Sequence, residues 1–336
     1  MTPSPFRFTA AAVGAGGPEA FDTVYHWLGV GFQGVNARHP EKWNYLAPMR
    51  QYSAKILLFG EHVVLRGGRG LAVPYPAKSL SWARSRTADE RLIDYARWLA
   101  ENAAEHVDAE RMLKDVSGGW RLLGDIPTGY GLGSSGAVVA AVYDRYGARS
   151  RVQGGVQKEQ GAEEFRAVLA HLEGYFHGSS SGTDPYVIYH DRPVLLGGGR
   201  PPTLLDLPTD PLRHFELYDT GVERDGSLFI HRFLERYAQD PAPIEKHWRT
   251  PSDRAIDALL ADNVPALREA FHEIAAFQRE TFGDFFPTGV PPTALKLCGA
   301  GGGGMLLALK PYRHPKASPP PARRPATPGP AGSRGD

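Results

Sequence analysis

A glycine- and serine-rich loop that runs directly into an apolar helix constrains this chain more than any other stretch. The loop lies in "DIPTGYGLGSSG", and "AVVAAVY" follows it at residues 137–143. Glycines keep side chains out of the way, so several backbone N–H groups can converge on one anion. A helix N-terminus adds unpaired N–H groups and the positive end of the helix dipole. Because this helix is apolar on nearly every face, we expect it to be buried and its N-terminus to be rigid.

The loop therefore predicts a phosphate site, and a serine-capped turn is the structural alternative. Its expected anion-binding residues are Gly129, Gly131, Gly133, Ser134, Ser135 and Gly136. The spacing also satisfies G-x-G-x-x-G, but the dinucleotide interpretation needs a carboxylate about 20 residues further on, and none occurs there. The protein-kinase interpretation needs H-R-D and D-F-G, and the Walker A interpretation needs Gly-Lys-Ser/Thr. The sequence contains none of these.

Composition narrows the class of protein. The chain has 336 residues, a formal net charge of +1 and a single cysteine, Cys298. The near-neutral charge gives no electrostatic reason to expect nucleic acid or an acidic membrane as a partner. One cysteine excludes an intrachain disulfide and fits a reducing compartment. No window approaches the roughly 18 apolar residues of a membrane span. We expect a cytoplasmic protein.

The order of patterns along the chain favours an α+β fold. Short apolar runs predict strands at residues 56–59, in "LAVPY", in "GGWRLLGDIP", in "PVLLGGG", in "HFELYDTG" and on both sides of the last glycine run. Helical periodicity covers residues 89–105, 162–177, 225–238 and, with a break, 251–281. We expect a division near residues 197–202. The Pro/Arg-rich end is expected to be disordered, and residues 1–50 carry no pattern with an evident role.

Three further segments carry side chains suited to chemistry. Glu173 lies on the flank of a helical apolar stripe, which predicts a half-shielded carboxylate. Asp184 follows a Ser/Gly loop and precedes a proline, which predicts an extended exit from the loop. Lys55 stands at the mouth of a predicted strand, with Glu61 and His62 just beyond it. Singly these are a surface Glu, a turn Asp and a strand-edge Lys. Together with the glycine loops they supply the parts that phosphoryl transfer requires.

Three segments in this order resemble motifs of the GHMP small-molecule kinases. They are "AKILLFGEHVVL", "IPTGYGLGSSGAVVAAV" and "KLCGAGGGG". The resemblance implies a two-domain α+β fold with the active site in the cleft between domains. It implies domains at residues 51–200, which bind ATP, and 201–312, flanked by an extension at 1–50 and a tail at 313–336. The tail stands at the point where the last strand and helix of such kinases normally finish, so the second domain is open to being incompletely closed.

The resemblance also implies roles for individual residues. Ser135 and Glu173 match the Mg²⁺-binding serine and glutamate, and Asp184 matches the aspartate that orients or deprotonates the substrate hydroxyl. Lys55 matches the lysine beside that aspartate. Glu61 and His62 are expected to face the substrate side of the cleft. The run containing Gly301, Gly302 and Gly303 is expected to support the phosphate loop. Gly136 stands where most members carry alanine, a difference expected to be harmless.

Within the family, "GEHV" together with "HGSSSGTD" most resembles the mevalonate kinases. This implies phosphorylation of a small-molecule alcohol, with ATP and Mg²⁺ as cofactors and mevalonate as the favoured acceptor. Arg224 is a candidate partner for the acceptor's carboxylate, and a solvated turn arginine is the equal alternative. Other GHMP kinases, acting on a sugar, phosphomevalonate or an amino-acid alcohol, remain rivals, as does a non-catalytic ATP sensor. The sequence leaves a homodimer open.

Overall fold

The computed structural model describes residues 49–148, 159–222, 226–299, 301 and 303–311. Arg224, Gly302, residues 313–336 and nearly all of residues 1–50 therefore lie outside the described residues. Helices and strands alternate without a regular βαβ repeat, and the α+β fold class is confirmed. The strands form two separate sheets, one from residues 51–204 and one from residues 215–309.

The first sheet has five strands in the order β1-β2-β4-β5, with β3 paired to β2, and every pairing is antiparallel. The strands are β1 (Gln51–Phe59), β2 (Arg69–Arg84), β3 (Trp120–Gly124), β4 (Val194–Gly197) and β5 (Thr203–Leu204). The short turn η1 (Val63–Arg66) connects β1 to β2. In β1 the side chains of Ala54, Ile56 and Leu58 are fully buried. The "KILLF" run thus forms a core strand, as its apolar pattern predicts.

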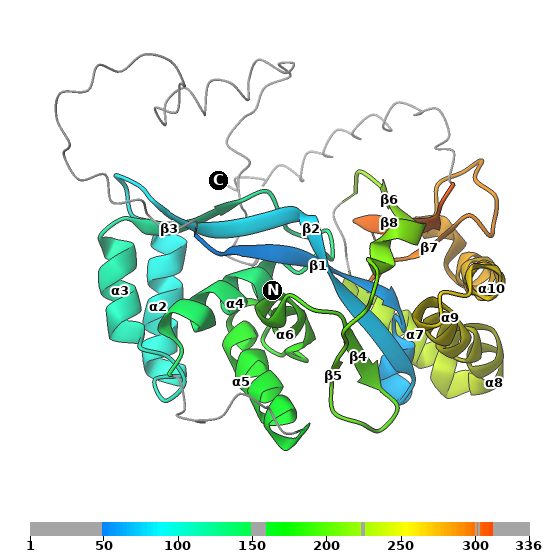
Figure 1. The fold of residues 1–336 in the computed structure, drawn as a ribbon, viewed down its shortest axis with the longest axis horizontal. Helices are drawn as coiled ribbons and strands as arrows, with labels where there is room; N and C mark the ends of the chain where they lie inside the picture. Colours follow the sequence, from blue (N-terminus) through cyan, green and yellow to red (C-terminus); the bar gives the residue numbers. More distant parts are fainter. Residues whose placement is uncertain (1–48, 149–158, 223–225, 300, 302, 312–336) are drawn as a thin grey trace, which may run out of the picture.

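Helices cover one face of this sheet (Figure 1). They are α2 (Glu90–Asn102), α3 (Ala109–Ser117), α4 (Ser134–Tyr146), α5 (Glu159–His177) and α6 (Thr183–His190). Asp89 caps α2 by accepting a hydrogen bond from the backbone N–H of Arg91, as the pattern at residue 89 predicts. In α4, every residue from 136 to 142 is buried. The central helix is therefore enclosed on all sides, and this confirms the prediction made from "AVVAAVY".

The second sheet has three antiparallel strands in the order β6-β8-β7. They are β6 (Phe215–Asp219), β7 (Leu295–Leu297) and β8 (Met305–Leu309), and η2 (Pro211–His214) leads into β6. Between β6 and β7 come α7 (Gly226–Gln239), α8 (Pro241–Ile244), η3 (Glu245–Arg249), α9 (Thr250–Leu260), α10 (Val264–Phe282) and η4 (Gly283–Phe285). These helices pack together beside the sheet (Figure 1). The predicted helix over residues 251–281 is broken at residues 261–263, as expected.

Helices α3 and α6 are among the elements that differ from the sequence-based expectation. Helix α3 was not predicted, although Asp108 caps it and Ala109, Met112 and Val116 form its buried face. Asp184 does not lie in an extended exit from its loop, because it stands in the first turn of α6. Proline lacks a backbone N–H, and the first turn of a helix is the one place where that donor has no intrahelical partner. Pro185, the third residue of this helix, is therefore accommodated in its first turn, and the extended interpretation of "TDP" was wrong.

Candidate active site

The site is organised around the N-terminus of α4. Gly129, Gly131 and Gly133 of the phosphate loop (residues 129–133) have φ values of 79°, 76° and 76°, a region that side chains other than glycine rarely adopt. Gly133 is the N-cap of α4 and supplies no side-chain hydrogen bond to the first turn. The N–H groups at the start of a buried helix therefore have no side-chain acceptor from their cap. Such a terminus favours an anionic ligand.

Lys55 and Asp184 meet beside this helix terminus. The Nζ atom of Lys55 lies 2.9 Å from Oδ1 of Asp184. The side chain of Lys55 is 7 % exposed and that of Asp184 is 31 % exposed, so the carboxylate can be reached by a ligand and the ammonium is shielded. The backbone N–H of Lys55 donates to the carbonyl oxygen of Leu132, 3.0 Å away, which joins β1 to the phosphate loop. The structure thus brings together the lysine, the aspartate and the loop that the sequence analysis singled out.

Gly136, in the first turn of α4, lets α4 and α6 approach each other closely. A Cβ atom at this position would lie 2.8 Å from Cβ of Asp184 and 2.8 Å from the backbone nitrogen of Pro185. An alanine here would require these atoms to shift, because non-bonded carbon atoms pack best about 3.5–4.0 Å apart. The glycine allows the start of α6, and with it Asp184, to sit against the first turn of α4.

Replacing Gly136 with Ala should displace Asp184 and reduce turnover. A shift of about 1 Å in a reacting group can lower a rate on the order of 10²-fold, so we expect a fall in kcat of about that size with the fold retained. Gly161→Ala is the matched control, because a Cβ atom at that helical glycine meets nothing within 4 Å. Equal kcat values for Gly136→Ala and Gly161→Ala would show that the contact between the two helices is not needed for catalysis.

Glu173 is more deeply buried than its sequence position predicts. The residue is 4 % exposed, not half-shielded. Its Oε1 atom accepts a hydrogen bond from Oγ of Ser135 at 2.9 Å, and its Oε2 atom accepts one from Oγ of Ser180. Burial raises the pKa of Glu173 to about 7, and the negative charge of Asp184 adds to this rise, while the two serine hydroxyls and Lys55 oppose it. A cation bound here would favour the ionised carboxylate.

His177 completes this cluster and was not assigned a role from the sequence. Its Nε2 atom lies 3.0 Å from Oγ of Ser135. It is the last residue of α5 and follows Glu173 by four positions, so both side chains lie on one face of the helix. That i, i+4 spacing from a predicted metal ligand was the signal in the sequence that could have identified it.

Glu61 and His62 do not line an open surface. Glu61 is 1 % exposed and forms an ion pair with Lys296, whose Nζ atom also donates to the carbonyl oxygen of Leu297. Burial raises the pKa of Glu61, and the charge of Lys296 opposes the rise. The expectation that these side chains face substrate is not met in this conformation. Glu61 instead joins the end of β1 to β7 in the second sheet.

His62 is enclosed by aromatic side chains. It is 4 % exposed, and its ring centroid lies 5.2 Å from that of Phe233 and 5.6 Å from that of Trp248. Phe233 lies in α7 and Trp248 lies in η3, both among the helices that pack beside the second sheet. His62 therefore contributes to packing between the two halves of the molecule.

The last glycine run contacts the phosphate loop. Gly301, Gly303 and Gly304 have φ values of 75°, 126° and 69°. A Cβ atom at Gly304 would lie 2.6 Å from the carbonyl oxygen of Tyr130, in the phosphate loop. The backbone at Gly304 therefore packs directly on the phosphate loop. The close approach supports the expectation that the glycine run buttresses that loop.

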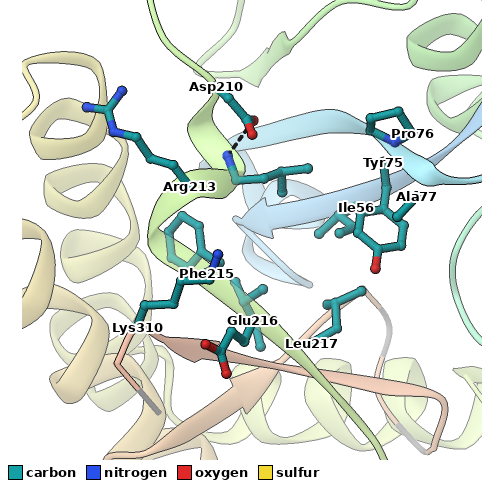
Figure 2. Close-up of a pocket in the computed structure, with 12 residues that line it drawn as sticks. Ile56, Tyr75, Pro76, Ala77, Asp210, Arg213, Phe215, Glu216, Leu217 and Lys310 are labelled. Carbon is teal, nitrogen blue, oxygen red and sulfur yellow. Dashed lines mark hydrogen bonds between the residues drawn. The ribbon is translucent and has the colours of Figure 1, made fainter.

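A groove of about 540 Å³, separate from these site residues, is lined by strands of both sheets (Figure 2). Ile56, Tyr75 and Ala77 line it from β1 and β2, and Phe215 and Leu217 line it from β6. Successive side chains of a strand point to opposite faces, so a groove lined by Ile56 lies on the other side of β1 from its neighbour Lys55. None of the residues predicted to carry out chemistry lines this groove.

In the parts of the chain that the structure describes, every helix is too short or too polar to cross a membrane.

Comparisons with known proteins identify the class of enzyme that this chain resembles. Residues 95–192 match the GHMP kinases N terminal domain. The mevalonate kinase of Thermococcus gammatolerans is 26 % identical over 313 residues, covering 77 % of this chain and 88 % of that protein.

Two solved structures share the fold. The L. major mevalonate kinase in complex with R-mevalonate gives a TM-score of 0.53 at 16 % identity and covers 79 % of this chain and 88 % of its own. The Streptococcus pneumoniae phosphomevalonate kinase in complex with phosphomevalonate and AMPPNP gives a TM-score of 0.52 at 17 % identity. The match covers 78 % of this chain and 92 % of that kinase. The matched domain, the curated relative and the shared fold agree with one another: the chain contains a GHMP kinase N-terminal domain at residues 95–192, and it is an ATP-dependent kinase.

Proposed function

We propose that this kinase transfers the γ-phosphoryl group of ATP to the primary hydroxyl of mevalonate, as a step in isoprenoid precursor synthesis. The observation that carries the proposal is the Lys55–Asp184 ion pair held against the N-terminus of α4. A base, a cation and a phosphate-binding helix terminus then converge on one point. The similarity to mevalonate kinases over most of the chain favours this acceptor.

The two charged residues have separate tasks in the proposed reaction. Asp184 accepts the proton of the acceptor hydroxyl as its oxygen forms a bond to the γ-phosphorus. The bond from that phosphorus to the β,γ-bridging oxygen breaks, and ADP leaves with the electron pair. The ammonium of Lys55, 2.9 Å from the Asp184 carboxylate, stabilises the charge on the transferring group. The N–H groups at the start of α4 hold the phosphates, so catalysis is mainly positioning and electrostatic stabilisation.

Ser135 and Glu173 fit a magnesium ion that arrives with the nucleotide. Among the described residues, no group of three or more His, Cys, Asp or Glu side chains could hold a metal by itself. Mg²⁺ is usually bound by one or two carboxylates together with phosphates and water, so one buried carboxylate and one adjacent hydroxyl suit it. When bound, the ion would neutralise the phosphate charge and draw Glu173 into its ionised form.

The test is ADP release measured with mevalonate, phosphomevalonate, galactose and homoserine as acceptors. We expect mevalonate to give the highest kcat/KM. If another alcohol gives the highest kcat/KM, the assignment of mevalonate as the acceptor is wrong, and the assignment as a small-molecule kinase is retained. A non-catalytic sensor would bind ATP and release no ADP with any of the four. A sensor has no need of a base beside the phosphate site, so the Lys55–Asp184 pair argues against it.

A further inference from the structure

We propose that His177 is a positioning residue that fixes the hydroxyl of Ser135 for the metal ion, an inference that rests on the proposed function. The two side chains come from different helices, His177 from the end of α5 and Ser135 from the first turn of α4. Their Nε2 and Oγ atoms are 3.0 Å apart. The contact therefore links the carboxylate-bearing helix to the phosphate-binding helix at the point where a metal would bind.

The hydrogen-bonding capacity of a serine hydroxyl decides the direction of this contact. The group has one proton and two lone pairs. Ser135 donates its proton to Oε1 of Glu173 at 2.9 Å, which is the arrangement required when Glu173 is ionised to bind a metal. The hydroxyl then has no proton left for His177. Nε2 of His177 must carry a proton and donate it to one lone pair of Ser135, so one lone pair remains for the metal ion.

Glu173 is held in the same way from its other side. Ser180 donates to Oε2, so both oxygens of the carboxylate accept from serines, one on each side. The hydroxyl of Ser180 also accepts a hydrogen bond from the backbone N–H of Gly182 at 2.9 Å, and this bond anchors Ser180 to its own loop. Two serine hydroxyls therefore orient Glu173, and the hydroxyl of Ser135 is in turn oriented by Glu173 and His177. Removing the imidazole leaves that hydroxyl held by Glu173 alone.

His177 is exposed, so its replacement should cost little folding stability. This separates a positioning role from a structural one. Groups that orient a metal ligand typically contribute 10- to 100-fold to metal affinity. A surface residue with no contact to a metal ligand contributes nothing measurable to metal affinity.

The experiment measures binding, not turnover. The full-length protein is titrated with MgCl₂ at fixed pH in the presence of AMP-PNP and without acceptor, and nucleotide binding is followed by calorimetry. We expect the Mg²⁺ concentration for half-maximal binding to rise about 10- to 100-fold in His177→Ala. In His177→Gln it should return to within a few-fold of the wild-type value, because the glutamine amide places an N–H donor close to the position of Nε2. His171→Ala is the control, since this exposed histidine of α5 contacts the carbonyl oxygen of Asn102 instead.

Three results would overturn the proposal, and they differ from one another. Wild-type magnesium dependence in His177→Ala would show that the imidazole does not position the ligand. A Gln variant as weak as the Ala variant would show that hydrogen-bond donation is not the cause. Failure of the wild-type protein to bind AMP-PNP with Mg²⁺ would overturn the proposed function itself, and this inference with it.

Discussion

Asp184→Asn should lower kcat by about 10²- to 10⁴-fold while nucleotide binding is retained, because the contribution of a general base has this size. The asparagine keeps the shape of the side chain but cannot accept the proton of the acceptor hydroxyl. It also leaves the Lys55 ammonium, only 7 % exposed, without its carboxylate partner. Single-turnover measurements at saturating ATP and acceptor would place the loss in the chemical step.

Glu173→Gln provides the comparison for that experiment. Its predicted defect is in holding the metal–nucleotide complex, so raised Mg²⁺ should recover part of the rate. The same magnesium titration should leave Asp184→Asn unchanged. Rescue of the Asp184 variant by magnesium, or ordinary metal dependence in the Glu173 variant, would contradict the division of roles between the two carboxylates.

Lys296→Met should reduce the free energy of unfolding by about 3–5 kcal/mol, the usual cost of removing one partner from a buried ion pair. Both side chains of the Glu61–Lys296 pair are fully buried. The substitution leaves the Glu61 carboxylate in apolar surroundings without a cation. Urea denaturation followed by tryptophan fluorescence is a suitable measurement, because Trp248 is buried against His62, the neighbour of Glu61.

The double variant Lys296→Met with Glu61→Leu tests the cause of that loss. Replacing both charges with apolar groups of similar size is often neutral or stabilising, so we expect most of the lost stability to return. A double variant no more stable than Lys296→Met alone would mean that the loss arises from packing and not from an isolated charge.

Local patterns were sufficient to predict most of the fold. The apolar run before Gly60, the cap at Asp89 and the all-apolar stretch in α4 each specify an element through interactions within a few residues. The association of Lys55 with Asp184 and of Ser135 with Glu173 came from the family resemblance, and the structure brings both pairs into contact. The roles of these four residues in catalysis remain predictions.

The features that sequence reasoning missed depend on distant partners. Glu61 lies next to a strand end, and its burial is explained by Lys296, 235 residues away. The close approach of α6 to Gly136 was not predicted, because nothing near Gly136 in sequence reveals it. Asp184 was placed in extended chain because a proline usually restricts the residue before it, whereas here Asp184 and the proline both lie in the first turn of a helix. No local pattern contains any of these facts.

The Glu61–Lys296 pair also restricts how the molecule can move. Glu61 follows β1 and Lys296 lies in β7, so parting the two sheets at this point would separate opposite charges in apolar surroundings. Such separation is strongly unfavourable at low dielectric. The pair therefore resists separation of the two halves at this point. We expect any opening of the site to occur more readily where Gly304 meets Tyr130, because the atoms in contact there belong to uncharged backbone.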